Sequence, residues 1–258
     1  SGRPLPVSAQ ETPFLEQTLE FLPTQTPPAD FDPSDKPLLF QYRQAPSIFD
    51  EEYVQEGLEA ELFAGDYYLG SVPLGNPFTV ACDRSADGKT LAFFNSFTFM
   101  DEVVKFPLHW LSLDDPKQIH TIEEAAHPVT FAFNPQGEEL AAIVEQNRTS
   151  QVLLIDMLSG ESRQIYQTDL AISLFWSPDG KKLALIQGTR RYEPDRQLVV
   201  LEIPSGEVLY QGDLELAGHP YRLPEDLSEA WITEQTLQRT LRQKSVADCI
   251  SPAISDSP

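Results

Sequence analysis

The sequence predicts an all-β fold of the β-propeller type, and two observations support this prediction. A short turn phrase occurs three times between apolar runs, and its glycines, Gly88, Gly137 and Gly180, lie 49 and 43 residues apart. This spacing is within or close to the repeat length of propeller blades. A second turn follows each copy, so each unit of roughly 45 residues offers four strands, the content of one blade.

The turn phrase is most regular in the third unit, where it reads Trp176-Ser177-Pro178-Asp179-Gly180-Lys181-Lys182-Leu183-Ala184. Proline sets φ near about −65°, and glycine accepts the positive φ that the turn requires. The second unit departs at Gln136, and the first has Ala86 in place of the proline. The runs on either side are rich in β-branched and aromatic residues and predict paired strands at 78–82 and 91–94, 129–133 and 140–144, and 172–176 and 183–186.

A second hairpin is predicted after each of these. Its strands are expected at 108–111 and 119–122, at 152–156 and 163–166, and at 198–202 and 208–210. One such unit cannot bury both of its faces alone, whereas stacked units can. We therefore expect the units to pack face to face.

The combined pattern resembles the WD40-like (PD40) repeat of TolB-type β-propellers, over about residues 78–213. Within these residues the Gly-His and Trp-Asp marks of eukaryotic WD repeats do not occur. The resemblance implies a propeller fold, binding to other proteins and an extracytoplasmic bacterial setting. It is specific for fold and weak for function, because propellers serve many roles.

Three blades do not close a ring, so further blade material is expected upstream. Segments 59–63 and 67–72 predict a hairpin that turns at 64–66, and 36–42 is a further strand that could pair across the ring closure. We interpret these pieces as a degenerate fourth blade, which gives a propeller-like domain over residues 36–213. The alternative is an open arc whose exposed edge is covered by a partner or by a second copy.

The flanking segments differ in composition from the repeats. Residues 1–35 are rich in proline, which predicts an extension or a strap, and Thr24-Gln25-Thr26-Pro27-Pro28 resembles the spacers that lift envelope domains off a membrane. No run of 18 apolar residues occurs, so no transmembrane segment is predicted and we expect the chain to be soluble, with a possible tether outside it.

Residues 214–258 predict a C-terminal helix and tail. Helical spacing over 227–242 places six side chains on one face: Leu227, Ala230, Trp231, Glu234, Leu237 and Leu241. We expect this helix to cap the last blade. The alternative is a helix that docks on a partner through Trp231, Leu237 and Leu241.

The chain carries a net charge of −22. Residues 1–77 hold 13 acidic residues against Arg3, Lys36 and Arg43, a net charge of −10. Such a surface repels nucleic acid and anionic lipid and suits basic proteins or divalent cations, or it serves solubility alone. A concentrated positive patch, Arg190, Arg191 and Tyr192, could anchor an acidic partner or could be an ordinary exposed loop.

Residue patterns for catalysis and for cofactors are absent from the sequence. The four histidines have no zinc-binding spacing, and neither a Gly-x-Ser-x-Gly elbow nor a glycine-rich phosphate loop occurs. Asp83, Ser85 and Asp87 resemble the opening of a calcium loop, but Phe94 stands where a bidentate glutamate belongs. A plain turn is therefore the better interpretation, and no catalytic, metal or cofactor residue is assigned.

The two cysteines make no metal motif. Cys82 is expected to be a small buried core residue and Cys249 a surface thiol, while a disulfide between them stays open.

These observations predict a non-catalytic protein-binding or assembly module of the bacterial envelope, extracytoplasmic and tethered, which could be a structural subunit of a membrane-associated complex. The alternative is a propeller enzyme or a ligand-sensing domain that uses a central pocket.

Overall fold

The computed structural model describes residues 25–41, 59–73, 80–99, 102–105, 107–125, 127–146, 148–188, 196–216 and 221–241. Strands dominate this part of the chain. The elements in chain order are β1 (Leu38–Gln41), β2 (Glu59–Ala64), β3 (Tyr67–Pro73), β4 (Val80–Arg84), β5 (Thr90–Phe99), β6 (Glu102–Lys105), β7 (Leu108–Ser112), β8 (Asp115–Ile122), η1 (Glu123–Ala125), β9 (Pro128–Phe133), β10 (Glu139–Gln146), β11 (Thr149–Asp156), β12 (Ser162–Thr168), β13 (Ala171–Trp176), β14 (Lys182–Gly188), β15 (Arg196–Glu202), β16 (Val208–Leu216), β17 (Tyr221–Arg222) and α2 (Glu234–Leu241).

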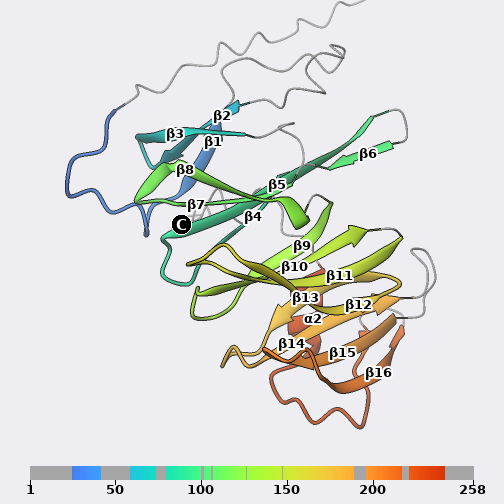
Figure 1. The fold of residues 1–258 in the computed structure, drawn as a ribbon. Coiled ribbons are helices and arrows are strands. Elements are labelled where there is room, and N and C mark those ends of the chain that lie inside the picture. Colours follow the sequence, from blue (N-terminus) through green and yellow to red (C-terminus); the bar gives the residue numbers. More distant parts are fainter. Residues whose placement is uncertain are drawn as a thin grey trace, which may run out of the picture.

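The strands form four antiparallel sheets, named here blades 1 to 4. Blade 1 has the order β1-β2-β3, blade 2 the order β4-β5-β7-β8, blade 3 the order β12-β11-β10-β9 and blade 4 the order β13-β14-β15-β16-β17. Figure 1 shows the blades stacked in sequence order, from blade 1 at one end to blade 4 at the other. The β-propeller type of fold predicted from the repeats is confirmed.

Blades 2, 3 and 4 are the three repeat units of the sequence. Each has the predicted four strands, and both predicted hairpins are present in each blade. In blade 2, the second half of β5 continues past the sheet and pairs with β6, where Phe97 lies opposite Val104. The strand order that the turn residues predict is therefore confirmed in blades 2 to 4.

Blade 1 is the degenerate blade expected upstream. The hairpin of β2 and β3 turns at Gly65 and Asp66, as predicted, while β1 pairs with β2 of the same blade. An isolated parallel bridge joins Gln25 to Tyr67 of β3, and the Phe31 ring lies 4.5 Å from the Tyr67 ring. The described residues before β1 therefore contact blade 1 at Tyr67, while the role of residues 1–35 as a strap stays a prediction.

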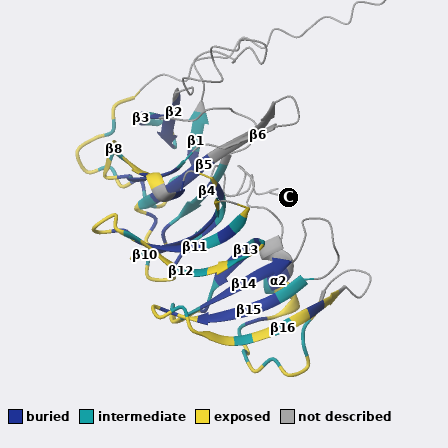
Figure 2. Cartoon of the chain, turned by 45° about the vertical axis from the view of Figure 1, so that its right-hand side comes forward, coloured by how far each residue is buried: buried dark blue, intermediate teal, exposed yellow. Residues whose placement is uncertain are grey.

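The stack is open. Blades 1 and 4 lie at its two ends in both views (Figures 1 and 2), and β1 pairs within its own blade rather than with the far end of the chain. The degenerate blade is thus present, the predicted pairing of the first strand across a ring closure is wrong for the described residues, and coverage of an exposed edge by a partner or a second copy stays a prediction.

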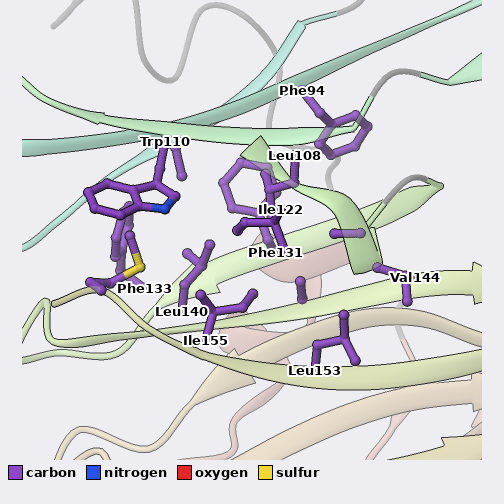
Figure 3. Close-up of a cluster of buried hydrophobic side chains, with 14 residues drawn as sticks. Phe94, Leu108, Trp110, Ile122, Phe131, Phe133, Leu140, Val144, Leu153 and Ile155 are labelled. Atoms are coloured by element: carbon purple, nitrogen blue, oxygen red, sulfur yellow. The ribbon is translucent and has the colours of Figure 1, made fainter. Parts of the chain in front are cut away.

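Apolar cores lie between successive blades, so buried residues alternate with exposed turns along the stack (Figure 2). Figure 3 shows the core between blades 2 and 3, where Trp110 and Leu108 of β7 face Phe131 of β9 and Leu140 of β10. Each fully buried Leu or Phe side chain contributes roughly 1.5–3 kcal/mol of hydrophobic stabilisation. The face-to-face cores, more than hydrogen bonds, hold the blades together.

Cys82 is 1% exposed in the core between blades 1 and 2, as predicted for a small core residue. Its sulfur is in a disulfide. The prediction for Cys249 lies outside the described residues.

The C-terminal helix is shorter than predicted, which is a correction to the sequence analysis. It begins at Glu234 rather than near Leu227. Thr233 caps it, because its hydroxyl accepts a hydrogen bond from the Thr236 amide at 3.1 Å. Residues before Thr233 form turns that follow the face of blade 4, where Leu227, Trp231 and Ile232 pack. Contact with the sheet, rather than helical periodicity, sets this path.

Candidate functional site

The turn phrases are closed by their own side chains. In blade 4, the Ser177 hydroxyl donates to Asp179 Oδ1 at 2.7 Å and accepts from the Lys182 amide at 2.9 Å. In blade 2, Ser85 donates to Asp87 Oδ1 at 2.6 Å in the same way. The hydrogen bond from Ser177 is the main reason that the pKa of Asp179 lies below its ordinary value. These carboxylates stabilise the turns.

The turn of blade 3 reaches the same result with different residues. Asn134 Oδ1 accepts the amides of Glu138 and Glu139 at 2.9 and 3.2 Å. Gln136, which departs from the repeat pattern, extends to blade 4 and donates from Nε2 to the Asp179 carbonyl at 3.5 Å. Gln136, which departs from the repeat pattern, therefore connects the turns of blades 3 and 4.

The calcium hypothesis concerned Asp83, Ser85 and Asp87. Asp83 Oδ2 accepts the Phe133 amide of blade 3 at 3.1 Å, whereas Asp87 Oδ1 accepts the Lys89 amide at 3.0 Å. In the described ranges, no three His, Cys, Asp or Glu side chains gather in a way that could hold a metal ion. Hydrogen bonds within the turn and between blades account for these oxygens.

In blades 2 and 4, the residue that precedes the turn serine bonds to an earlier part of the chain, a role that was not predicted from the sequence. Arg84 donates from Nη1 and Nη2 to the carbonyls of Ser34, Lys36 and Pro33 at 3.1, 3.0 and 3.2 Å. At the equivalent position, Trp176 Nε1 donates to a blade 3 carbonyl at 3.0 Å. Arg84 and Trp176 are both large hydrogen-bond donors at the same position of the repeat. This shared position is the sequence feature from which the role could have been predicted.

The C-terminal segment covers the outer face of blade 4. Leu237 is 1% exposed and lies in the apolar core that this segment forms with β13 to β16. Trp231 is half-buried and meets Phe175 edge-on, with the ring centroids 5.4 Å apart. The predicted cap is therefore present. Leu241 ends α2, and docking of a partner on these residues stays a prediction.

A polar bond fixes this cap at its edge. Glu229 accepts from Lys182 Nζ through Oε1 and from Trp231 Nε1 through Oε2, each at 2.7 Å. The side chain of Glu229 is only 14% exposed. Its hydrogen bond with Lys182 is the first reason that the pKa of Glu229 is lowered.

The positive cluster of Arg190, Arg191 and Tyr192 lies outside the described residues, between β14 and β15. Its role as an anchor for an acidic partner stays a prediction.

Two histidines have structural contacts. His109 is 8% exposed, its Nδ1 lies 3.0 Å from Thr121 Oγ1, and burial lowers its pKa. His120 stacks on Trp110 at a centroid distance of 4.0 Å and an interplanar angle of 8°. Both side chains thus belong to the packing of blade 2.

A small cavity lies at the outer hairpin of blade 3. It has a volume of about 250 Å³ and is lined by Glu139, Asp156, Glu161 and Arg163 among others. Burial raises the pKa of Glu139. Arg163 donates to the Pro204 carbonyl of blade 4 at 2.8 Å, and Asp156 Oδ1 accepts two turn amides. Much of its polar lining is therefore engaged in structure.

No protein-family profile and no curated protein matches this chain. Among solved structures, the chain is similar to TolB from Acinetobacter baumannii, with 15% identity, a TM-score of 0.41, and coverage of 62% of this chain and 38% of that one. It is also similar to the β-propeller domain of the Trilobed protease from Pyrococcus furiosus, with 15% identity, a TM-score of 0.41, and coverage of 53% and 44%.

A third similar structure is the acylaminoacyl peptidase of Pyrococcus horikoshii, with 16% identity, a TM-score of 0.42, and coverage of 53% of this chain and 25% of that one. The chain thus spans less than half the length of each of these three proteins. The assignment to the β-propeller type of fold rests on the repeated sheets and turns of the chain itself.

Proposed function

We propose that this chain is a non-catalytic protein-binding or assembly module built as an open stack of blades. The observation that carries the proposal is the cap on blade 4, because the face that would meet a further blade is covered by Ile232, Leu237 and their neighbours. The described blades therefore form an arc that ends at blade 4, and we propose that the sides of this arc bind the partner. Stacked repeats of this kind commonly use such extended surfaces to bind other proteins.

The charge of the chain supports a basic protein as the partner. A net charge of −22 favours association with basic surfaces and opposes binding to nucleic acid or anionic lipid. Trp231, Leu241 and the cluster of Arg190, Arg191 and Tyr192 are further proposed contacts.

An extracytoplasmic setting, with the chain tethered in the bacterial envelope as a subunit of a membrane-associated complex, is part of the proposal. The resemblance of the repeats to TolB-type propellers supports it, and so does the disulfide at Cys82, since disulfides persist in oxidising compartments. In the ranges that the structure describes, none of the helices has the length and apolar composition to cross a membrane.

The alternative function is ligand sensing or catalysis in a pocket. The cavity at Glu139 favours it, because a partly buried carboxyl group with a raised pKa in a cavity is a common feature of functional sites. This cavity lies at an outer hairpin rather than in a central channel.

Affinity capture from a native envelope extract tests the proposal. The chain, tagged at its C-terminus, is incubated with the extract, washed at moderate salt and analysed by quantitative mass spectrometry. We expect a protein partner in stoichiometric amount. A variant that loosens the cap, Leu237→Ala, serves as a comparison, since a partner held by the cap is lost while a partner held on the flanks is kept.

Recovery of the chain alone at low salt would contradict an assembly role. Small-molecule screening by thermal shift, with Glu139→Gln as the comparison, then tests the alternative. A compound that stabilises the unmodified chain but not the variant would assign the function to the cavity.

A further inference from the structure

The outer strand of the last blade has an edge that is only partly paired. β16 pairs with β15 from Val208 to Leu214 on one side. On its other side, in the part of the chain that the structure describes, only Glu215 and Leu216 have a partner strand, the two-residue β17. The backbone from Val208 to Asp213 therefore presents an open edge of a sheet.

The outer strands of blades 2 and 3 have features that blunt their edges. β8 contains Pro116 and Lys117, residue types that disfavour pairing at an edge, and it lies against β3 of blade 1. β12 is overlaid by the next blade, since Arg163 donates to Pro204, and a Cβ added at Gly206 would lie 2.1 Å from the Ile165 carbonyl oxygen. β16 contains neither proline nor a basic residue.

The side chains at this edge are apolar at one end and acidic at the other. Val208 and Leu209 are 43% and 44% exposed. Gln211 and Asp213 are exposed and hold Gln197 of β15 between them, through hydrogen bonds of 2.8 and 2.9 Å. A strand added here would meet an apolar residue first and a carboxylate further along.

β17 shows that this edge accepts an added strand. It pairs antiparallel with the end of β16 and places Arg222 directly opposite Glu215, while the Arg222 guanidinium forms its ion pair with Glu225. Opposite charges in such cross-strand positions stabilise pairing. The same arrangement, continued along the open edge, calls for a basic residue opposite Asp213.

We propose that the open edge of β16, from Val208 to Asp213, binds an extended basic segment of another protein as an added antiparallel strand. The segment carries a basic residue opposite Asp213 and an apolar residue opposite Leu209. Backbone hydrogen bonds supply the general attraction in this mode of binding, and alternate side chains supply the selectivity. The proposal rests on the protein-binding function proposed above and names the chemistry of the partner.

A second copy of the chain is a poorer occupant. Another β16 brings no basic residue to Asp213, and it adds the carboxylates of its own Asp213 and Glu215. Two chains of charge −22 also repel each other. Charge complementarity therefore selects a basic segment.

A labelled peptide of sequence Thr-Lys-Thr-Gln-Thr-Val-Thr, which places lysine opposite Asp213 and valine opposite Leu209, tests the proposal by fluorescence anisotropy at low salt. Its acidic twin has glutamate for lysine, and a second twin carries N-methyl groups on alternate amides. The protein variants are Asp213→Lys and, as a control with the same change of charge, Asp66→Lys at the exposed turn of blade 1. We expect the basic peptide to bind the full chain.

Asp213→Lys is expected to weaken binding of the basic peptide by about fivefold and to make the acidic twin the better ligand, since an exposed pair of charges changes affinity modestly. Asp66→Lys should leave the affinity within about twofold, and the N-methylated twin should fail to bind. Equal binding of the N-methylated twin would exclude strand addition. Equal weakening by Asp213→Lys and Asp66→Lys would mean that the overall charge of the chain, and not a site at Asp213, determines binding of the peptide.

Two further outcomes separate this proposal from the proposed function. A dimer seen by sedimentation that is lost in Asp213→Lys would make a second copy the occupant and overturn the proposal. Capture of one native partner in equal amounts by the unmodified chain and by Asp213→Lys would overturn it as well, while a protein-binding function would stand. Failure to capture any protein partner would contradict both the strand-addition proposal and the proposed protein-binding function.

Discussion

The two chain segments that flank the blades are held to the stack by different kinds of interaction. At the N-terminal end, Arg84 of blade 2 donates to three carbonyls in the segment that precedes blade 1. At the C-terminal end, the chain covers blade 4 with an apolar core that includes Ile232 and Leu237, and a polar bond from Lys182 to Glu229 lies at its margin.

This difference follows from what each end must cover. The outer face of blade 4 is apolar over β13 to β16, so only apolar side chains can cover it favourably. The segment before β1 has few apolar residues, and its free carbonyls require donors. The stability of the C-terminal end should therefore depend most on buried apolar side chains. The stability of the N-terminal end should depend most on hydrogen-bond donors.

The largest effect is expected from Leu237→Ala at the C-terminal end. Removal of this fully buried side chain should lower the free energy of unfolding by about 2–5 kcal/mol. Leu158→Ala is the matched control, because Leu158 is 97% exposed and its truncation should change stability by less than about 0.5 kcal/mol. Denaturant unfolding of both variants measures the difference, and equal values would mean that α2 does not cap blade 4.

Arg84→Ala should have the next largest effect, at the N-terminal end. Its guanidinium bonds to carbonyls are charge-assisted, and their loss from a half-buried site should cost about 2 kcal/mol. Amide hydrogen exchange should increase in residues 33–41 while blade 4 is unchanged. Arg163→Ala, which removes one bond to a neighbouring blade, is the control and should cost under about 1 kcal/mol. Uniform acceleration across all blades would contradict a local clamp.

A pair of glycine substitutions sharpens the same comparison. Gly88 and Gly160 have similar positive φ values, 74° and 73°. A Cβ at Gly88 would lie 2.3 Å from the Ser34 carbonyl oxygen, whereas a Cβ at Gly160 meets nothing within 4 Å. Both changes to alanine carry backbone strain of about 1 kcal/mol, and Gly88→Ala should cost about 1 kcal/mol more. Thermal unfolding is a sufficient test, and equal shifts would show that the segment at Ser34 yields freely.

The smallest effect is the pH dependence of the cap. The folded-state pKa of Glu229 lies below its ordinary value of 4.5, so its stabilisation is present above about pH 4.5 and is lost as the pH falls through the lower, folded-state pKa. Because Lys182 is partly exposed, the contribution should be under about 1 kcal/mol. The stability difference between the unmodified chain and Glu229→Gln should shrink below pH 4.5. A stability difference that instead grows as the pH falls would mean that the pKa of Glu229 is raised in the folded state.

Local chemistry was sufficient to predict the blades. Ser177, Asp179 and Gly180 close their turn through contacts within five residues, so the turn and the strands on either side can be recognised from a short stretch of chain. The hairpin of blade 1 was recognised from the strand-like runs on either side of Gly65 and Asp66. The predicted start of the C-terminal helix was wrong. Residues 227–232 form turns because they pack against the face of blade 4, and the spacing of apolar residues carries no information about that contact.

Contacts between distant residues could not be predicted in this way. Arg84 finds its carbonyls about 50 positions earlier, and Asp83 finds the Phe133 amide 50 positions later. The open edge of β16 exists only because the chain turns away after β17 to cover blade 4. Repeated turn residues therefore determine the strands and their order, while the ends of the stack, its openness and its exposed edge depend on packing between surfaces that meet only after the blades have formed.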